Sequence, residues 1–204
     1  MLSSSAVADE PIELWNRGAH VAIALDAILA MDRRRLTEVG HLPRTPGYYL
    51  VFYRRPDRSW STIDPTLYAS VDRGTYPLYV GSAVNLRERI GEHRKNTEAV
   101  ASFSGGEDLF TAAVPLHSHA DALYAEQLLL GALRCVWNEK FCQGWGSSWQ
   151  GATRATQAPT PWSVLHPGRR TGLGTSRSTA SELAHRVRDH LAQTVDLEIC
   201  RSLT

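Results

Sequence analysis

The feature that most constrains this chain is a short apolar strand that leads directly into a helix. Residues 77–93 read PLYVGSAVNLRERIGEH. The apolar residues 78–80 predict a strand, Gly81 predicts a turn, and residues 84–96 predict a helix. The apolar face of that helix should pack on the sheet to which the strand belongs.

Two polar side chains lie at the edge of this apolar face. At 100° per residue, Leu86 and Ile90 define the face. Arg89 and His93 flank it on the same side, so we expect both to lie near the sheet. An arginine and a histidine four residues apart are most often an ordinary boundary pair, so this pattern alone does not identify a site.

Further elements are predicted on both sides of this strand and helix. We expect helices at 11–38, 119–135 and about 180–195, and strands at 47–55 and 108–116. The first helix should end in the basic run 33–35, before Pro43 and Pro46. The core order is therefore strand, strand, helix, strand, helix, which predicts an α+β fold.

Residues 141–181 differ in character from the rest of the chain. They are rich in Gly, Ser, Thr and Pro, and no Asp or Glu occurs between Glu139 and Glu182. Three tryptophans, Trp145, Trp149 and Trp162, argue against plain disorder. Two interpretations stay open: a binding loop, or a structural wrap over the core in which the tryptophans are packing anchors.

Composition and charge set few limits on function. With 43% hydrophobic residues the 204-residue chain can bury a substantial core, and its net charge of +1 favours no partner. Lys95 and Lys140 are the only lysines among 22 basic residues. Arginine suits phosphate and guanine edges, but a GC-rich genome would produce the same bias, so both explanations stay open.

The cysteines and the chain start argue for a reduced, soluble, cytoplasmic protein with no membrane partner. Cys135, Cys142 and Cys200 show no CxxC spacing, which argues against a zinc knuckle or a disulfide framework. The first residues lack the basic and apolar regions of a signal peptide. The longest apolar run, 21–31, contains Asp26 and is too short to span a bilayer.

Several common catalytic motifs can be excluded. The sequence contains no HExxH, GxSxG or GxxxxGK(S/T) pattern. The Asp/Glu-x-Lys nuclease element is also excluded, because His93 and Asn138 stand two places before the two lysines. His117 and His119 could ligate a metal, but such a loop pair is most often solvated.

Three other residues stand out from their surroundings. Glu126 shares a helix face with the apolar residues Ala122, Leu123, Leu129, Leu130 and Leu133. A carboxylate in an apolar stripe needs an ion-pair partner or a bound cation, and either reading fits. Tyr49 and Tyr79 fall in neighbouring strands, in Gly-Tyr-Tyr and Tyr-Val-Gly contexts, where a single tyrosine is more often packing.

Taken together, these residues resemble the GIY-YIG nuclease superfamily. The resemblance rests on Gly47-Tyr48-Tyr49, Tyr79-Val80-Gly81, Arg89, His93, Glu126 and Asn138, in that order. It spans roughly residues 44–140 and is specific because six separated positions agree. It implies an α+β core with a three-stranded mixed or antiparallel sheet flanked by helices.

The layout most resembles the small type II restriction endonucleases of this superfamily that cut CCGCGG. The resemblance implies an N-terminal helical extension (1–43), a nuclease core (44–140) with a long hairpin insertion (56–76), and a loop-rich C-terminal extension (141–204) packed with the core as one domain. The tail 157–170, QAPTPWSVLHPGRR, is similar to that group in particular. Tyr48 departs from the usual aliphatic residue of the first half-motif, and the connection at 55–76 is longer than usual.

The resemblance also implies a role for each site residue. Glu126 would hold one Mg²⁺ ion, for which Mn²⁺ may be exchanged, and the ion would stabilise charge as a Lewis acid. Arg89 would clamp the phosphate, and Tyr49, hydrogen-bonded near His93, would be the general base. Because a free tyrosine has a pKa of about 10, nearby cations must favour its phenolate or its proton must pass to His93. Tyr79 and Asn138 would position phosphate, water or the metal ligand.

The expected partner is double-stranded DNA, bound by a homodimer or a homotetramer. Predicted DNA contacts come from the helix after the second strand and from the C-terminal extension: Arg87, Arg94, Lys95, Arg154, Gln157, Arg169 and Arg170. A structure-specific repair or mobile-element nuclease on the same core is an alternative function. A non-catalytic DNA-binding module is a third, disfavoured because all six site positions carry competent residues.

Overall fold

The core is an antiparallel sheet covered by helices on both faces. The computed structural model describes residues 17–53, 77–98, 100, 109–146, 157–167 and 174–193. Within them the sheet has the strand order β1-β4-β2-β3, and every pairing is antiparallel. The strands are β1 (Arg34–Arg35), β2 (Gly47–Tyr53), β3 (Pro77–Ala83) and β4 (Leu109–Pro115).

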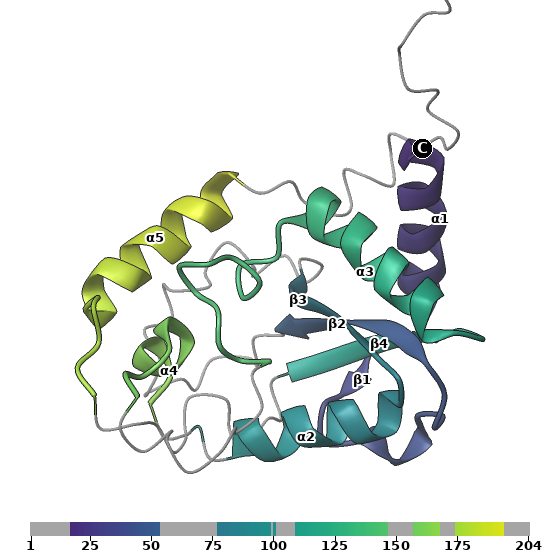
Figure 1. Cartoon of the computed structure of the whole chain (residues 1–204), viewed down its shortest axis with the longest axis horizontal. Helices are drawn as coiled ribbons and strands as arrows, with labels where there is room; N and C mark the ends of the chain where they lie inside the picture. Colours follow the sequence, from purple (N-terminus) through teal and green to yellow (C-terminus); the bar gives the residue numbers. More distant parts are fainter. Residues whose placement is uncertain are drawn as a thin grey trace, which may run out of the picture.

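The helices form two layers around this sheet. They are α1 (Arg17–Leu29), α2 (Leu86–Glu98), α3 (His119–Leu133), α4 (Pro161–Leu165) and α5 (Ala180–Gln193), with a 3-10 turn at Val39–His41. Figure 1 shows α1 and α3 together on one side of the sheet and α2 on the other. Helices α4 and α5 lie to the left of the sheet in this view. The predicted α+β class is confirmed. None of the helices in the described ranges is long and apolar enough to cross a membrane.

Strand β2 is the centre of the core because both of its faces are covered. All seven of its residues are buried. Alternate side chains point to opposite faces, so Tyr48 and Leu50 join a cluster with α1 and α3. Tyr49 and Val51 join a second cluster with α2 and three tryptophans. A strand buried on both faces reads as a continuous apolar run, which is how the sequence predicted it.

Two boundaries predicted near the first half of the core are wrong. The N-terminal helix ends at Leu29, and the basic run does not continue it. Instead, Arg34 and Arg35 form β1, which pairs with Thr111 and Phe110 of β4. This short edge strand makes the sheet four-stranded, whereas three strands were predicted. The pairing partner lies more than 70 residues away, so local periodicity carries no signal for it.

The second wrong boundary concerns Gly81. The sequence predicted a turn there, but β3 continues through Gly81 to Ala83, and Gly81 pairs with Tyr49 of β2. A glycine inside a strand often marks a close approach of another group. That is its role here, because the Tyr49 ring lies against it.

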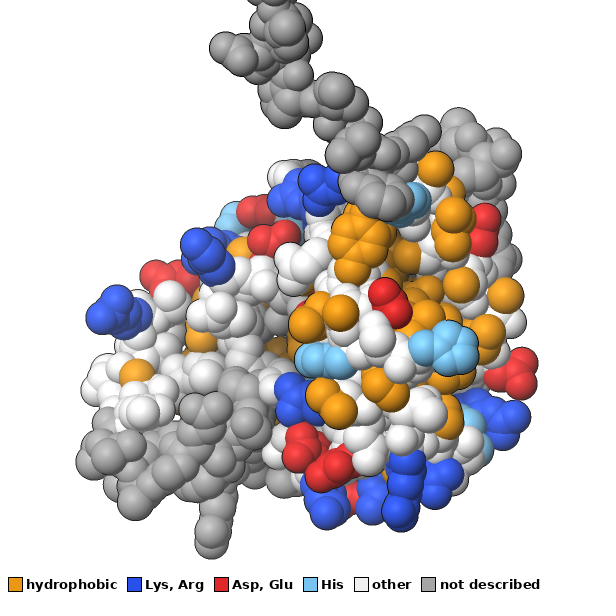
Figure 2. Space-filling view, turned by 45° about the vertical axis from the view of Figure 1, so that its right-hand side comes forward, with side chains coloured by type: hydrophobic (Ala, Val, Ile, Leu, Met, Phe, Trp, Pro, Cys, Tyr) orange, Lys and Arg blue, Asp and Glu red, His pale blue; other side chains and the backbone are white. Residues whose placement is uncertain are grey.

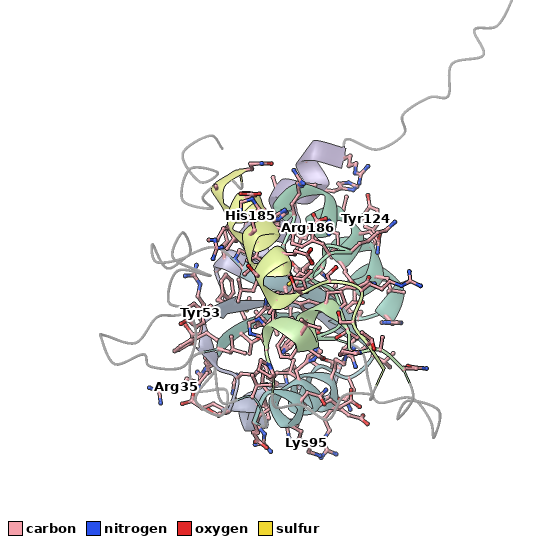
Figure 3. The ribbon with its side chains drawn as sticks, turned by 90° about the vertical axis from the view of Figure 1, so that its left-hand side faces the viewer. Arg35, Tyr53, Lys95, Tyr124, His185 and Arg186 are labelled. Atoms are coloured by element: carbon pink, nitrogen blue, oxygen red, sulfur yellow. The ribbon has the colours of Figure 1, made fainter. Side chains whose placement is uncertain are left out.

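The C-terminal extension contributes to the core. Trp137, Trp145 and Trp162 are fully buried and belong to the same cluster as Tyr49 and Val187. Trp145 and Trp162 are packed as the wrap interpretation describes, while Trp149 lies outside the described residues. Figure 3 shows α4 and α5 in front of the sheet, and Arg186 of α5 lies 4.7 Å from the ring centre of Phe141.

Helix α4 was not predicted, although its start carries a local signal. The Thr160 side chain accepts a hydrogen bond from the backbone N–H of Ser163, and Pro161 follows in the first turn. A Thr cap followed by proline is a common helix start. The five-residue helix is too short for a hydrophobic period to show.

Replacing Tyr48 by phenylalanine is expected to reduce stability at neutral pH but not in alkali. The Tyr48 hydroxyl donates a 2.8 Å hydrogen bond to the Ala24 carbonyl, worth about 1 kcal/mol. Burial raises the pKa of Tyr48 from 10.0 to about 12. Because the folded-state pKa is raised, the stability that the protonated Tyr48 hydroxyl gives the folded state is complete below pH 10. It is lost as the pH rises from 10 through 12.

Urea unfolding of both proteins at pH 8 and pH 11 checks this expectation. Wild type should be more stable by about 1 kcal/mol at pH 8, and the difference should shrink by about 1 kcal/mol at pH 11. A stability difference that is the same at both pH values would contradict it.

Candidate active site

A tyrosine of the sheet and a histidine of the helix that packs on it form the centre of the site. Tyr49 comes from β2 and His93 from α2, and both are fully buried. The Tyr49 hydroxyl lies 2.6 Å from Nε2 of His93. Helix α2 packs on this face through Leu86 and Ile90, which places His93 toward the sheet as the helical period predicted.

Tyr79 of β3 completes an aromatic group around this pair. Its ring centre lies 6.1 Å from that of Tyr49 and 5.8 Å from that of His93. Gly81 makes this approach possible. A Cβ atom on Gly81 would lie 2.7 Å from the Tyr49 hydroxyl oxygen and 2.8 Å from Cε1 of Tyr79, closer than real Cβ contacts allow.

Replacing Gly81 by alanine is therefore expected to displace both tyrosines. A misplacement of about 1 Å can cost about 10²-fold in rate, so cleavage by the variant should fall by about that factor. The matched control is Gly91→Ala, because a Cβ at Gly91 meets nothing within 4 Å. Gly91→Ala should keep wild-type cleavage and gain up to about 1 kcal/mol of stability. Equal cleavage rates in the two variants, measured on the same duplex, would contradict the packing argument.

Arg89 lies over the same group and is held by two acceptors. Its Nη1 lies 2.9 Å from Oε2 of Glu92, and its Nη2 donates a 2.6 Å hydrogen bond to the Gly146 carbonyl. Its positive charge also lowers the pKa of Tyr49. The side chain remains 27% exposed, so a substrate phosphate can reach the guanidinium.

Glu126 comes from the helix layer on the opposite face of the sheet, beside the edge strand β3. It lies on α3, and the Ser82 hydroxyl donates a hydrogen bond to its Oε2. Among the described residues Glu126 forms no ion pair with an arginine, so the salt-bridge reading of this residue is not what the structure shows. Leu123, three residues before Glu126 on α3, is 43% exposed, so this part of the predicted apolar face is not buried.

The donor set at Glu126 suits a hydrated magnesium ion. The carboxylate is partly exposed, and only one of its oxygens receives the Ser82 hydrogen bond. Mg²⁺ keeps several waters and is usually bound through one or two carboxylates. No group of three or more His, Cys, Asp or Glu side chains that could hold a metal occurs in the described part of the chain, His117 and His119 included.

The electrostatics of the two tyrosines decide how a proton can leave the site. Burial raises the pKa of Tyr49 well above its ordinary value of 10.0, the neighbouring Tyr79 raises it further, and the Arg89 guanidinium lowers it. Burial, followed by the charge of Glu126, also raises the pKa of Tyr79. Tyr49 is therefore a neutral phenol near neutral pH, which favours passing its proton to His93 over a preformed phenolate.

Asn138 fixes the chain after α3 to the edge of β3. Its Oδ1 accepts a 2.9 Å hydrogen bond from the Val80 N–H, and its Nδ2 donates a 2.9 Å bond to the Val80 carbonyl. The neighbouring Trp137 N–H bonds to the Leu78 carbonyl. These contacts satisfy backbone groups that an edge strand leaves open and hold Asn138 beside Tyr79. A direct role of Asn138 at phosphate stays a prediction.

The residues predicted to contact DNA are only partly described. Arg87, Arg94 and Lys95 lie on α2, and Nε of Arg87 donates a 2.5 Å hydrogen bond to the Leu42 carbonyl. Lys95 is exposed at the outer edge of α2 (Figure 3). Figure 2 shows Lys and Arg side chains gathered along the lower edge of the molecule, the height at which α2 lies in Figure 1. Gln157 is exposed, whereas Arg154, Arg169 and Arg170 lie outside the described residues.

Three residues of the site were not among the predicted catalytic residues. Ser82 holds the Glu126 carboxylate, Glu92 holds Arg89, and Trp145 lies against His93. Strand alternation could have found Ser82, since it points to the face opposite Tyr79. The helical period could have found Glu92, three residues after Arg89. No sequence signal pairs Trp145 with His93.

Comparison with known proteins found one matching family model and several similar solved structures. The family model described as the Eco29kI GIY-YIG domain matches residues 82–195, more than half of the chain. A search of curated proteins found no match. Among solved structures, the chain is similar to the magnesium-bound GIY-YIG N-terminal endonuclease domain of UvrC from Thermotoga maritima, with 18% identity over 50% of this chain and 93% of that one and a TM-score of 0.33. A point mutant of the same domain, with its divalent cation bound, gives 18% identity, the same coverage and a TM-score of 0.34.

Proposed function

Because the chain belongs to the Eco29kI family of GIY-YIG restriction endonucleases, we propose that it hydrolyses double-stranded DNA at the palindrome CCGCGG in a Mg²⁺-dependent reaction. The observation that carries the chemistry is the 2.6 Å contact between the Tyr49 hydroxyl and Nε2 of His93, beside Arg89. Phosphodiester hydrolysis needs an activated water and charge stabilisation at the phosphate. The described residues include a candidate group for each need.

The proposed proton path runs from water through Tyr49 to His93. Water attacks phosphorus while the Tyr49 oxygen takes its proton and the hydroxyl proton moves to Nε2 of His93. The bond from phosphorus to the 3′ oxygen breaks, and this oxygen takes up a proton from solvent water, which leaves a 5′-phosphate and a 3′-hydroxyl. The raised pKa of Tyr49 supports this relay, because a free phenolate is scarce near neutral pH.

Arg89 and Glu126 have complementary roles in the proposal. The Arg89 guanidinium binds the phosphate oxygens and stabilises the charge that develops on them. Glu126, oriented by Ser82, holds the magnesium ion. When bound there, Mg²⁺ supplies Lewis-acid stabilisation of the phosphate; Mn²⁺, with similar oxygen ligands, is the expected substitute.

DNA contact is proposed along the exposed side of α2 and over the C-terminal extension. Arg94 and Lys95 supply charge that tracks phosphates, and Gln157, Arg154, Arg169 and Arg170 are candidates for base edges. Alanine variants of each, assayed on cognate and mismatched duplexes at two salt concentrations, separate the roles. A base contact costs about 1–3 kcal/mol at one position, whereas a phosphate contact lowers the salt slope by about one.

Cutting both strands of a palindrome requires two active sites. The described residues form one catalytic set per chain, so we propose a symmetric homodimer on DNA, with a homotetramer as the alternative. Sedimentation of the DNA complex in Ca²⁺ measures this directly. A lone monomer that makes double-strand breaks would contradict it.

The experiment that tests the activity compares plasmids with and without one CCGCGG site. With Mg²⁺ the protein should linearise only the plasmid that has the site, and EDTA should stop the reaction. Nicking that depends on DNA structure rather than sequence would favour a repair or mobile-element nuclease. Binding without any cutting would favour a non-catalytic module.

A further inference from the structure

Trp145 packs against the histidine of the catalytic pair. Its indole stacks on the His93 imidazole with ring centres 4.0 Å apart and an interplanar angle of 11°. The same indole meets Tyr79 edge-on, with ring centres 4.9 Å apart. Trp145 is fully buried, so this contact belongs to the interior of the protein and not to a surface loop.

The next residue, Gly146, makes two further contacts with the site. Its carbonyl accepts the 2.6 Å hydrogen bond from Nη2 of Arg89. A Cβ atom on Gly146 would lie 2.5 Å from the Tyr79 hydroxyl oxygen, so the backbone passes close to that side chain. Two adjacent residues of the extension therefore contact three of the predicted catalytic residues: Tyr79, Arg89 and His93.

The stack restrains a torsion that the catalytic geometry requires. The imidazole of a histidine rotates about a broad, roughly two-fold χ2 torsion, and only one orientation keeps Nε2 at 2.6 Å from the Tyr49 hydroxyl. A near-parallel indole at 4.0 Å blocks that rotation. The indole also packs against Trp137, with ring centres 5.2 Å apart.

We propose that Trp145 is a positioning residue, which fixes the His93 ring so that Nε2 accepts the proton from Tyr49. This inference rests on the proposed nuclease function. It assigns Trp145 and Gly146, near the start of the C-terminal extension, to the active site. The extension then completes the catalytic geometry in addition to its expected contact with DNA. Packing alone would make Trp145 equivalent to the other buried tryptophans.

The experiment compares three variants with wild type on a CCGCGG duplex in Mg²⁺. Trp145→Phe keeps an aromatic face against His93, and Trp145→Leu removes it. Trp162→Leu is the matched control, because Trp162 is equally buried but its ring packs against Trp137 and His166. The measurements are kcat, KM and DNA affinity in Ca²⁺, at a temperature where each variant is folded by circular dichroism.

Trp145→Leu should lose about 10²-fold in kcat while its KM and DNA affinity stay within about twofold of wild type, and Trp145→Phe should recover at least about ten-fold of that loss. Trp162→Leu should lose stability but keep kcat within about threefold, because its removal leaves the stack in place. Should Trp145→Leu fail to fold, Trp145→Met gives the same comparison with an unbranched, more adaptable side chain of similar volume.

A second readout follows the ring itself. In wild type, the ring current of an indole stacked at 4.0 Å should shift the His93 imidazole proton signals upfield, and this shift should be lost in Trp145→Leu but kept in Trp162→Leu. If the wild-type protein cuts DNA, two results would overturn the positioning role: equal losses of kcat in Trp145→Leu and Trp162→Leu, or wild-type kcat in Trp145→Leu. A wild-type protein that does not cut would overturn the proposed function instead, and this inference with it.

Discussion

Replacing Glu126 by alanine or glutamine is expected to abolish DNA cleavage while DNA binding is kept. Glu126 is bonded to Ser82 beside the two site tyrosines, and its charge raises the pKa of both; the proposed function places the ion there. Loss of the ion removes several kcal/mol of transition-state stabilisation. The rate should therefore fall by about 10³-fold or more.

Single-turnover cleavage and gel-shift affinity in Ca²⁺ separate the two effects. Glu88→Gln is the matched control, because Glu88 is an exposed carboxylate on α2 that is hydrogen-bonded to Asn85. The control should cut like wild type. Wild-type cleavage by Glu126→Gln would show that the metal is held elsewhere, whereas loss of binding together with cleavage would give Glu126 a role in docking.

Replacing Tyr49 by phenylalanine should cost almost as much activity with little change in the fold. The substitution removes only the hydroxyl that lies 2.6 Å from Nε2 of His93 and leaves the buried ring in place. Losing a general base costs about 10²–10⁴-fold in rate. The unfolding free energy should change by no more than about 1.5 kcal/mol, the value of one hydrogen bond.

The neighbouring tyrosine is the control for this substitution. Tyr48 lies on the same strand but on the opposite face, bonded to Ala24. Tyr48→Phe should lose about 1 kcal/mol of stability and keep wild-type kcat. Quench-flow measurement of both variants decides the case: comparable rates would show that the Tyr49 hydroxyl takes no part in the chemistry.

Most of the core could be predicted because its signals are local. The continuous apolar run of β2, the apolar face of α2 and the Ser118 cap of α3 each lie within a few residues of the element they define. Among the site residues, the helical period of α2 was enough to predict that His93 lies at the sheet with Arg89 beside it. Glu126 stood out because a carboxylate in a largely apolar helix needs a partner.

The features that the sequence did not predict depend mostly on contacts between distant parts of the chain. Pairing of Arg34 with Thr111 made a strand from a run that reads as a helix end. Gly81 read as a turn because a glycine inside a strand gives the same local signal as a loop. Trp145 meets His93 across 52 positions, and two aromatic residues that far apart have no sequence pattern that predicts a stack.

The measurement that tests the central claim most directly is the sequencing of fragment ends after digestion of a known genome with the protein and Mg²⁺. The proposed function predicts that every end maps to a CCGCGG site, with a 5′-phosphate on each strand, and that EDTA or Glu126→Gln leaves the DNA intact. Ends scattered over unrelated sequences, ends clustered at another sequence, or intact DNA in the presence of Mg²⁺ would contradict it.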